Sequence, residues 1–438
     1  MVTFLQKVKQ LFLLTIIFTC IILSIIFIHK NPLNLSILNL AKFTKNTDSK
    51  YPSSFVWKLT AYPENISYCN FNYGLPEKLT FNESDLSFSP ESEKPGKYRV
   101  LYDVIRNKHT PEVPEVTYAT HVTADFTSYV AEIARVWEGP ISVAAFTPQT
   151  DLILTLNIIN QLCYCLPEMT RVSLHLIFPE ENVPRENLVI AKPKNCLVPN
   201  SEKLETIRSS NRSVKYPINV CRNVARVASS TKYVLVSDIQ LIPSDFLASK
   251  FIHMLEKHRK PLNSMTKVVF VIPVFEVEST VDIPGNKSTL LHLLKTERAV
   301  YFHRYVCSHC QKFPGIERWL ESNNREEITP FLTVKREIPY QRWEPIYIGT
   351  HSEPLYNENL SWEGLQDKML QMLEMCLLEY KFLILDNAFL VHWPGIKRKK
   401  TYEEFWRTDA QIENSIQYKK TLKKFLNKFR SKSKCQLK

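Results

Sequence analysis

Two polar residues in this 438-residue sequence follow apolar runs at positions where a divalent metal ion could bind. Asp238 follows YVLVS, and His392 follows FLV. Carboxylate oxygens and imidazole nitrogens are common metal ligands, and a cation held there could neutralise a leaving diphosphate. Each residue also has a simpler interpretation: the aspartate could cap the following turn, and the histidine could be an ordinary hydrogen-bonded side chain.

A second pair of candidates, Glu363 and Asp367, precedes an amphipathic run that continues to Tyr380. If a helix opens at this point, residues four apart share one side of it, and either carboxylate could deprotonate an acceptor hydroxyl as a general base. The alternative is that both are ordinary acidic residues of a first helical turn, where the helix dipole favours negative charge.

The cysteines offer a weaker metal signal. Cys307 and Cys310 have the spacing of two zinc ligands, but no second C-x-x-C completes the set, so a disulfide, or two half-cystines of unrelated disulfides, is favoured over zinc. The pair Cys163 and Cys165 has the same interpretation. Nine cysteines follow the N-terminal apolar run, an odd number, and Cys435 near the C-terminus is the candidate for the one left outside an intrachain disulfide.

Only 8 glycines are present, and they are scattered along the chain. A G-x-G-x-x-G dinucleotide turn and a G-x-x-x-x-G-K-[ST] phosphate loop both require clustered glycines, because the backbone must approach the phosphates closely. Neither motif occurs, so a bound nucleotide must be held in another way.

Apolar strand-like runs alternate with amphipathic stretches from Glu115 onward, which predicts an α/β fold with a central mostly parallel sheet. The predicted strands are 141–146, 172–178, 233–239, 268–275 and 382–393, and the predicted helices are 151–162, 217–228 and 245–258. Ligands bind outside the carboxyl ends of such strands, which is where the first two candidate residues lie.

Residues 11–28 form an uninterrupted apolar run long enough to span a bilayer. No small-x-small cleavage site follows, which favours an uncleaved anchor over a cleaved signal peptide. Six N-x-[ST] sites and the cysteines downstream favour a lumenal body. We therefore expect a single-pass type II membrane protein of the secretory pathway.

We divide the chain into a cytosolic tail (1–10), the anchor (11–28), a stem with an N-terminal subregion (29–97), an α/β domain (98–396) and a basic C-terminal helical segment (397–438). The last segment holds 14 lysines and arginines against 4 acidic residues, in a chain of net charge +12. A solvated helix is the simplest explanation. Docking to an anionic acceptor or a membrane surface is the alternative, and nucleic acid is not expected as a partner.

Four segments that occur in a fixed order resemble glycosyltransferase family 49, over residues 98–430. They are YPINVCRNVAR (216–226), YVLVSDIQLIPSDFL (233–247), VVFVIPVFEVE (268–278) and the segment from Trp362 to Gly395. The resemblance implies a GT-A-like nucleotide-diphospho-sugar transferase in the Golgi membrane, with a UDP-sugar donor, Mn²⁺ and inversion at the transferred sugar.

The resemblance also assigns roles to individual residues. Asp238 matches the first acid of the family's D-x-D metal motif, and His392 matches a histidine that reaches the metal and diphosphate. The donor-binding segment matches Arg222, Asn223 and Arg226. Gln240 stands where the second acid is expected, and a neutral amide binds Mn²⁺ more weakly than a carboxylate does. Relatives carry Asn at the position of Asp367, so its base role rests on chemistry alone.

The expected reaction is transfer of glucuronic acid from UDP to a glycan or glycoprotein acceptor, as in O-mannosyl glycan synthesis. UDP-N-acetylglucosamine is the alternative donor. Because of Gln240, the rival hypothesis is a homologue that has lost turnover and binds a glycan or stabilises a partner Golgi transferase.

Overall fold

The computed structural model describes most of the chain after residue 62. The described residues are 63–91, 96–108, 113–184, 188–197, 206, 214–259, 262, 265–322, 326–398, 405–429 and 433–435. The predicted tail, the anchor at 11–28 and the first part of the stem lie outside them. Among the described residues, no helix combines the length and the apolar character needed to cross a membrane.

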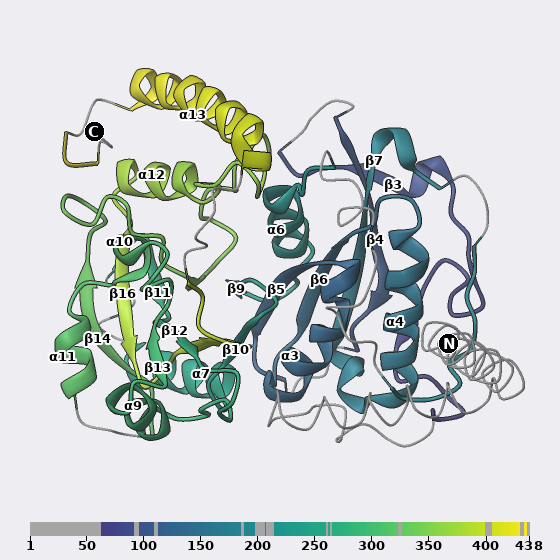
Figure 1. Ribbon diagram of the computed structural model, residues 1–438, viewed down its shortest axis with the longest axis horizontal. Helices are drawn as coiled ribbons and strands as arrows, with labels where there is room; N and C mark the ends of the chain where they lie inside the picture. The colour runs from purple at the N-terminus through teal and green to yellow at the C-terminus, as the bar shows by residue number, and fades with distance from the viewer. Residues whose placement is uncertain are drawn as a thin grey trace, which may run out of the picture. The chain divides into compact units, whose positions relative to one another are not determined.

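The largest sheet is mixed, with parallel strands at its centre (Figure 1). Its order is β1-β4-β7-β6-β5-β9-β15-β11-β16-β14, and β3 pairs with β4. Strands β7, β6, β5 and β9 are parallel, as are β11 and β16, and β15 joins the two blocks in antiparallel pairing. The bounds are β1 Asn70–Phe71, β3 Leu86–Phe88, β4 Tyr98–Arg106, β5 Val116–Thr123, β6 Ile141–Phe146, β7 Val172–Pro179, β9 Tyr233–Val236, β11 Val268–Val271, β14 Thr329–Val334, β15 Tyr347–Gly349 and β16 Lys381–Asp386. The predicted α/β class and parallel centre are confirmed.

A second sheet of four strands, in the order β10-β17-β12-β13, continues from the large one. Its strands are β10 Leu241–Pro243, β12 Val274–Val277, β13 Ala299–Tyr301 and β17 Leu390–His392. Three strands of the large sheet lead directly into it along the chain: β9 into β10, β11 into β12, and β16 into β17. The short connections between these strands form a junction of the two sheets. A third, separate pair joins β2 (Lys78–Leu79) to β8 (Leu188–Val189).

The junction corrects two strand predictions. The runs 268–275 and 382–393 are mostly apolar, yet each is split into two strands that belong to different sheets. Pro273 lacks the N–H that a continuous ladder needs, and Asn387 has a left-handed φ of 60°, which breaks an extended strand. The polar pair Asp386 and Asn387 marks the second break, whereas hydrophobicity alone does not reveal the first.

Helices cover both faces of the parallel block. Helix α6 (Ile218–Val227) packs its apolar side onto residues of β4, β5, β6, β7 and β9. Side chains of a strand alternate between faces, so Ala119 meets α6 while Tyr118 points the other way and contacts Trp137 at the end of α3 (Val130–Val136), with 5.4 Å between ring centroids. The other helices are α4 Asp151–Cys165, α7 Leu247–Lys257, α9 Lys287–Lys295, α10 Ser308–Gln311, α11 Ile316–Glu321, α12 Met369–Leu377 and α13 Thr408–Lys428. The three predicted helices are therefore confirmed.

The N-terminal part of the described chain belongs to the main fold. Strands β1 and β3 pair with β4, and Cys69 forms a disulfide with Cys163 in α4. The boundary predicted at residue 97 between a stem subregion and the α/β domain is therefore wrong for residues 63–91, because this stretch completes one edge of the sheet.

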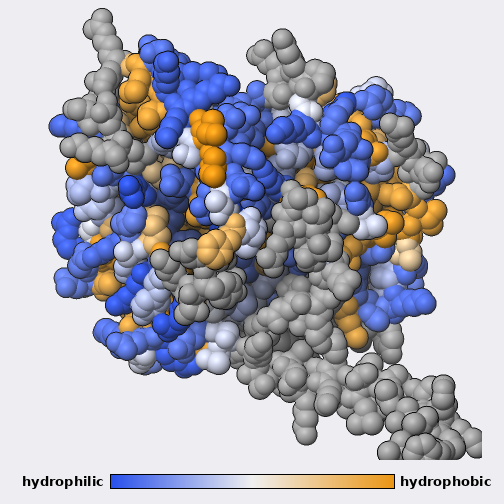
Figure 2. All heavy atoms as spheres, turned by 45° about the horizontal axis from the view of Figure 1, so that its top comes forward, coloured by the Kyte–Doolittle hydropathy of each residue, from blue (hydrophilic) through white to orange (hydrophobic). Residues whose placement is uncertain are grey.

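The C-terminal segment is also part of the fold rather than a separate unit. Buried Asn414 of α13 donates to the carbonyls of Ser361 and Leu365, at 2.9 Å each, and so fixes the turn before α12. Gly364 permits this approach, because a Cβ there would overlap the Asn414 side chain. Most lysines of α13 are exposed, and the face seen in Figure 2 is largely hydrophilic, in agreement with the predicted solvated helix.

Eight cysteines pair in four disulfides: Cys69–Cys163, Cys165–Cys196, Cys307–Cys310 and Cys376–Cys435. The disulfide interpretation of the C-x-x-C motif is confirmed, whereas Cys163 and Cys165 are half-cystines of two separate disulfides. The expectation for Cys435 is wrong, since α12 and the C-terminal segment pack together and bring it to Cys376. Cys221, which is buried in α6, takes part in none of the four.

Opening the Cys376–Cys435 disulfide with paired serine substitutions should destabilise the protein by about 2–4 kcal/mol, because a cross-link over 59 residues restricts the unfolded chain strongly. The Cys307/Cys310 double serine variant is the matched control: its partners are only 3 residues apart, so we expect a much smaller loss. Urea unfolding of both variants measures the difference. Equal losses would contradict the entropic explanation.

Candidate active site

Asp238 lies just past the carboxyl end of β9, at the junction of the two sheets. Its Oδ1 accepts hydrogen bonds from His121 Nε2 at 3.1 Å and from Arg222 Nη2 at 3.2 Å. Its Oδ2 has Lys368 Nζ at 3.9 Å, and 34% of the side chain is exposed. Oδ1 is therefore hydrogen-bonded within the protein, whereas Oδ2 lies near Lys368 on a partly exposed side chain.

The charges around Asp238 keep it ionised. Burial by itself would raise the pKa of this carboxyl, but Lys368, the hydrogen bond from His121 and Arg222 hold the pKa well below its usual range. Burial lowers the pKa of His121, and Asp238 only partly opposes this. Arg222 is 2% exposed; burial would lower its pKa, but Asp367 and Asp238 raise it above its usual value.

The turn before α12 differs from the predicted helix opening. Helix α12 begins only at Met369, and residues 365–366 have positive φ, so Glu363 and Asp367 do not share a helix face. Both oxygens of Glu363 lie 3.1 Å from the backbone nitrogen of Tyr216, which donates to them, and the side chain is buried. This geometry gives Glu363 a structural contact at the entrance to α6 and does not support a role as base.

Asp367 faces the site, but it is already paired. Arg222 Nη1 donates to Asp367 Oδ2, while Nη2 of the same guanidinium donates to Asp238. The Asp367 side chain is 16% exposed. The structure therefore joins Asp238, Arg222 and Asp367 into one charged cluster, which the sequence spacing did not indicate.

The other two residues of the predicted donor-binding segment hold a loop instead. Asn223 donates to the carbonyl of Tyr356 at 2.8 Å and accepts from its N–H at 2.9 Å. Arg226 donates to the carbonyls of Pro354 at 2.9 Å and Glu353 at 2.7 Å. Both side chains are buried and their polar groups are engaged by the loop after β15. Of the three, Arg222 alone reaches the charged cluster.

His392 ends β17 and lies at the same junction. It is in register with Leu241 of β10, and the neighbouring Trp393 N–H donates to the Gln240 carbonyl at 3.1 Å. The His392 side chain is 3% exposed; its Nδ1 lies 3.3 Å from the Gly395 carbonyl, and its Nε2 has no hydrogen-bond partner among the described residues. A buried ring nitrogen without a partner is unusual and suits a ligand atom.

The surroundings of His392 keep its ring neutral. Burial lowers the pKa of His392 well below its usual range, and Lys397 lowers it further. Glu276 is in register with His392 in the neighbouring strand β12, and its oxygens accept the N–H groups of His303 at 3.2 Å and Lys397 at 3.1 Å. Burial raises the pKa of Glu276 to about 7. Glu276 thus tethers the chain segments after β13 and β17.

These atoms fit a divalent cation only if the ligand brings further donors. Asp238 Oδ2 and His392 Nε2 are the available atoms, and Gln240 adds a neutral amide at the same junction. The described residues contain one cluster of three possible His, Cys, Asp or Glu ligands, at 307–310, but its two thiols form a disulfide. A hard cation prefers six or more oxygen ligands, so a diphosphate and water would have to complete the set.

Three residues near the cluster were missed by the sequence interpretation. His121 lies on β5, a strand that was not predicted although VTYATHVT is rich in β-branched residues. Lys368 follows Asp367 and was not singled out. Glu344 is far from both in sequence; burial raises the pKa of its carboxyl, with Lys368 opposing and Asp367 adding to the rise. Lys368 adjoins Asp367 in the sequence, whereas only the tertiary structure brings His121 and Glu344 near the cluster.

A family model described as "Glycosyl-transferase for dystroglycan" matches residues 115–430. Beta-1,4-glucuronyltransferase 1 of Danio rerio is 30% identical over 322 residues, covering 68% of this chain and 72% of that protein. The Homo sapiens protein of the same name is 26% identical, covering 75% and 77%. Xylosyl- and glucuronyltransferase LARGE1 of Homo sapiens is 23% identical, covering 72% of this chain and 36% of that protein.

Replacing Asn223 by alanine should loosen the loop after β15, because the two backbone groups of Tyr356 lose buried partners, at about 1–3 kcal/mol in local stability. Hydrogen exchange followed by mass spectrometry should show faster exchange in peptides covering residues 350–358. Asn427→Ala, at an exposed position of α13, is the control. Unchanged exchange in the loop would refute the structural role of Asn223.

Proposed function

Because the chain belongs to the family of glycosyl-transferases for dystroglycan and is a glycosyltransferase, we propose that it transfers glucuronic acid from a UDP donor to a glycan acceptor at the junction of the two sheets. The observation that carries this proposal is that an ionised Asp238 and a neutral His392, whose Nε2 has no hydrogen-bond partner among the described residues, lie at the same junction. Two groups of this kind suit a cation and diphosphate bound together.

The donor we favour carries an acid on its sugar. Lys368 and Lys397 both act on the pKa values of the groups at the junction, so two cations besides Arg222 lie within electrostatic reach of a bound donor. Cations in this position attract a ligand with several negative charges, such as a UDP-uronate. The relatives named as glucuronyltransferases support the same donor, with UDP-N-acetylglucosamine as the alternative.

Mn²⁺ would be held by Asp238, His392 and, more weakly, Gln240, and it would stabilise the charge that develops on the departing UDP. The side chains of the protein do the rest of the positioning. Arg222 holds Asp238 in place through Oδ1 and leaves Oδ2 towards the ligand. Lys368 then offers a cation beside the same oxygen.

The acceptor hydroxyl must lose a proton while the bond between the sugar C1 and the UDP oxygen breaks with inversion. Glu344 is better suited than Glu363 to take that proton, because it interacts electrostatically with Lys368, Asp367 and Arg222 of the cluster, whereas Glu363 accepts the Tyr216 N–H. Burial raises the pKa of the Glu344 carboxyl, which favours proton uptake. Asp367 stays a candidate, although Arg222 already engages it.

We further propose a Golgi setting, with residues 11–28 as a type II anchor and the described fold in the lumen. The four disulfides fit an oxidising compartment. The asparagines of four N-x-S sites are exposed and open to glycosylation: Asn65, Asn82, Asn286 and Asn359.

Turnover of a panel of UDP-sugars in the presence of Mn²⁺ tests the metal assignment. We expect Asp238→Asn to lower kcat/KM by at least about 100-fold, through loss of the anionic ligand, and Gln240→Asp to raise the affinity for Mn²⁺. If Gln240→Asp raised activity while Asp238→Asn left it unchanged, the assignment would be wrong. Retained UDP binding without turnover of any donor would favour the alternative function of a glycan-binding or partner-stabilising homologue.

The base assignment is tested by Glu344→Gln, which should lower kcat by about 10²–10⁴-fold with little change in UDP affinity. Because a base must be ionised, the raised pKa of Glu344 predicts that kcat of the unmodified protein falls, as the pH is lowered, at a higher pH than an ordinary glutamate would give. Asp367→Asn is the comparison, and it should also weaken the contact with Arg222. A larger kcat loss in Asp367→Asn, at equal thermal stability, would transfer the role to Asp367.

A further inference from the structure

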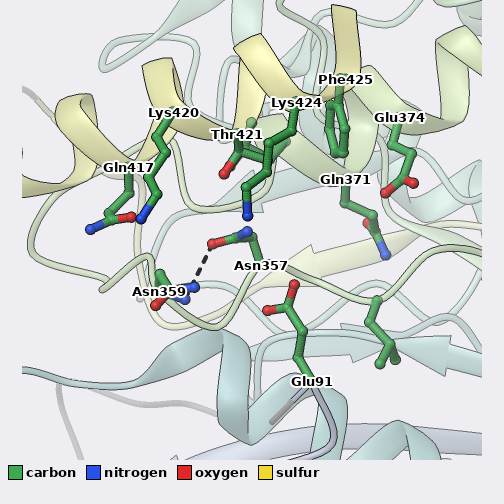
Figure 3. A pocket seen from close by; sticks show the side chains of 12 residues that line it. Glu91, Asn357, Asn359, Gln371, Glu374, Gln417, Lys420, Thr421, Lys424 and Phe425 are labelled. Carbon is green, nitrogen blue, oxygen red and sulfur yellow. Dashed lines mark hydrogen bonds between the residues drawn. The ribbon is translucent and has the colours of Figure 1, made fainter. Parts of the chain in front are cut away.

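A pocket of about 370 Å³ lies between α12, α13 and the loop after β15 (Figure 3). Pockets that bind small molecules have volumes of roughly 300–1,000 Å³. Side chains reach it from three directions: from α13 above, from α12 at one side, and from the loop and Glu91 below. The pocket is distinct from the junction of the two sheets, because none of the candidate site residues lines it.

Neutral polar side chains are the largest class among the residues that line the pocket. Four amide side chains line the pocket: Asn357, Asn359, Gln371 and Gln417. The hydroxyl of Thr421 and the ring of Phe425 lie beside them on α13. Amides both donate and accept hydrogen bonds, and an aromatic ring offers an apolar face. This combination matches a ring compound with hydroxyl groups on its rim and C–H groups on its faces.

Gln371 is the most specific feature. Its side chain is 1% exposed, and its Nε2 donates to the carbonyl of Pro354 at 2.8 Å. Its Oε1 has no hydrogen-bond partner among the described residues. A buried acceptor without a donor is costly and rare. Because Gln371 lines the pocket, a hydroxyl of a bound ligand can supply the missing donor.

The charges of the pocket balance. Glu91 and Glu374 face Lys420 and Lys424, which descend from α13. This set gives no net attraction for a strongly anionic ligand. We propose that this pocket binds a neutral carbohydrate, with the Gln371 Oε1 accepting from a sugar hydroxyl and Phe425 packing against a sugar face.

The loop after β15 connects the pocket with the candidate active site. The Arg222 guanidinium lies 5.3 Å from the Tyr356 ring centroid, whereas Leu355 and Asn357 on either side of Tyr356 line the pocket. The sugar has two sources: a distal part of an acceptor glycan, which rests on the proposed function, or an N-glycan on Asn359, which does not.

Saturation-transfer difference NMR on the full-length chain, with methyl β-D-xylopyranoside and methyl β-D-glucopyranoside as probes, tests the proposal. The measurement is made on the unmodified protein and on Ser361→Ala, which removes the N-x-S site and leaves the lining intact. Binding to both forms indicates an external glycan. Binding only to Ser361→Ala, with Asn359 glycosylated in the unmodified protein by mass spectrometry, indicates the protein's own glycan. Binding to neither overturns the proposal.

Variants of the lining make the test specific. Gln371→Leu and Gln417→Leu should each weaken probe binding roughly fivefold, as expected for one lost hydrogen bond. Gln417 lies on the partly exposed side of α13, so its replacement tests the pocket even if Gln371→Leu fails to fold. Lys423→Met, on the same helix but outside the lining, is the control. Unchanged probe affinity in Gln417→Leu would overturn the proposal. UDP affinity should stay constant in all variants, which separates this result from a failure of the proposed function.

Discussion

The burial of the Arg222 guanidinium is the constraint on which the site depends. A buried cation is tolerated only when it is paired and hydrogen-bonded, and here two carboxylates from distant parts of the chain supply the pairing. Asp238 comes from the end of β9 and Asp367 from the turn before α12, while Arg222 itself lies on α6. One side chain therefore fixes three elements relative to each other, and it leaves Asp238 with one oxygen still directed to the ligand side.

The junction of the two sheets explains why the remaining polar residues meet there. Three strands of the large sheet continue into the small one, and the short connection from β9 to β10 carries Asp238 and Gln240. His392 meets them there because it is in register with Leu241, the first residue of β10. With Gln240 in place of an acid, Asp238 is the one carboxylate among the predicted metal ligands, and Lys368 Nζ lies 3.9 Å from its Oδ2. Such a site binds a metal best as a complex with an anionic donor, rather than on its own. The neutral pocket beyond the loop after β15 has the opposite character, which suits a different part of a substrate.

Predictions from the sequence were correct where the amphipathic period was strong, and they failed where the chain forms a turn before a helix. The helices at 151–162, 217–228 and 245–258 carry clear amphipathic periods, and all three form. The predicted helix opening at Trp362 does not form, because positive φ at residues 365–366 and the contact from Asn414 hold a turn instead. Asn223 and Arg226 look like ligand-binding residues in a linear motif. Their hydrogen-bond partners lie more than a hundred residues away, in a loop that no sequence pattern associates with them.

The sequence by itself determined the α/β class and the positions of Asp238 and His392 at strand ends, because these follow from residue type and local hydrophobic period. That Gln240 replaces an expected acid followed from the resemblance to the family. Only the tertiary structure decided which polar side chains form hydrogen bonds within the protein and which remain free to contact a ligand. Backbone groups form hydrogen bonds with the side chains of Glu363, Asn223 and Arg226. His392 Nε2 and Gln371 Oε1, in contrast, have no hydrogen-bond partners among the described residues. The reason is physical: satisfaction of a buried polar atom depends on neighbours brought from elsewhere in the chain, and no local pattern encodes them.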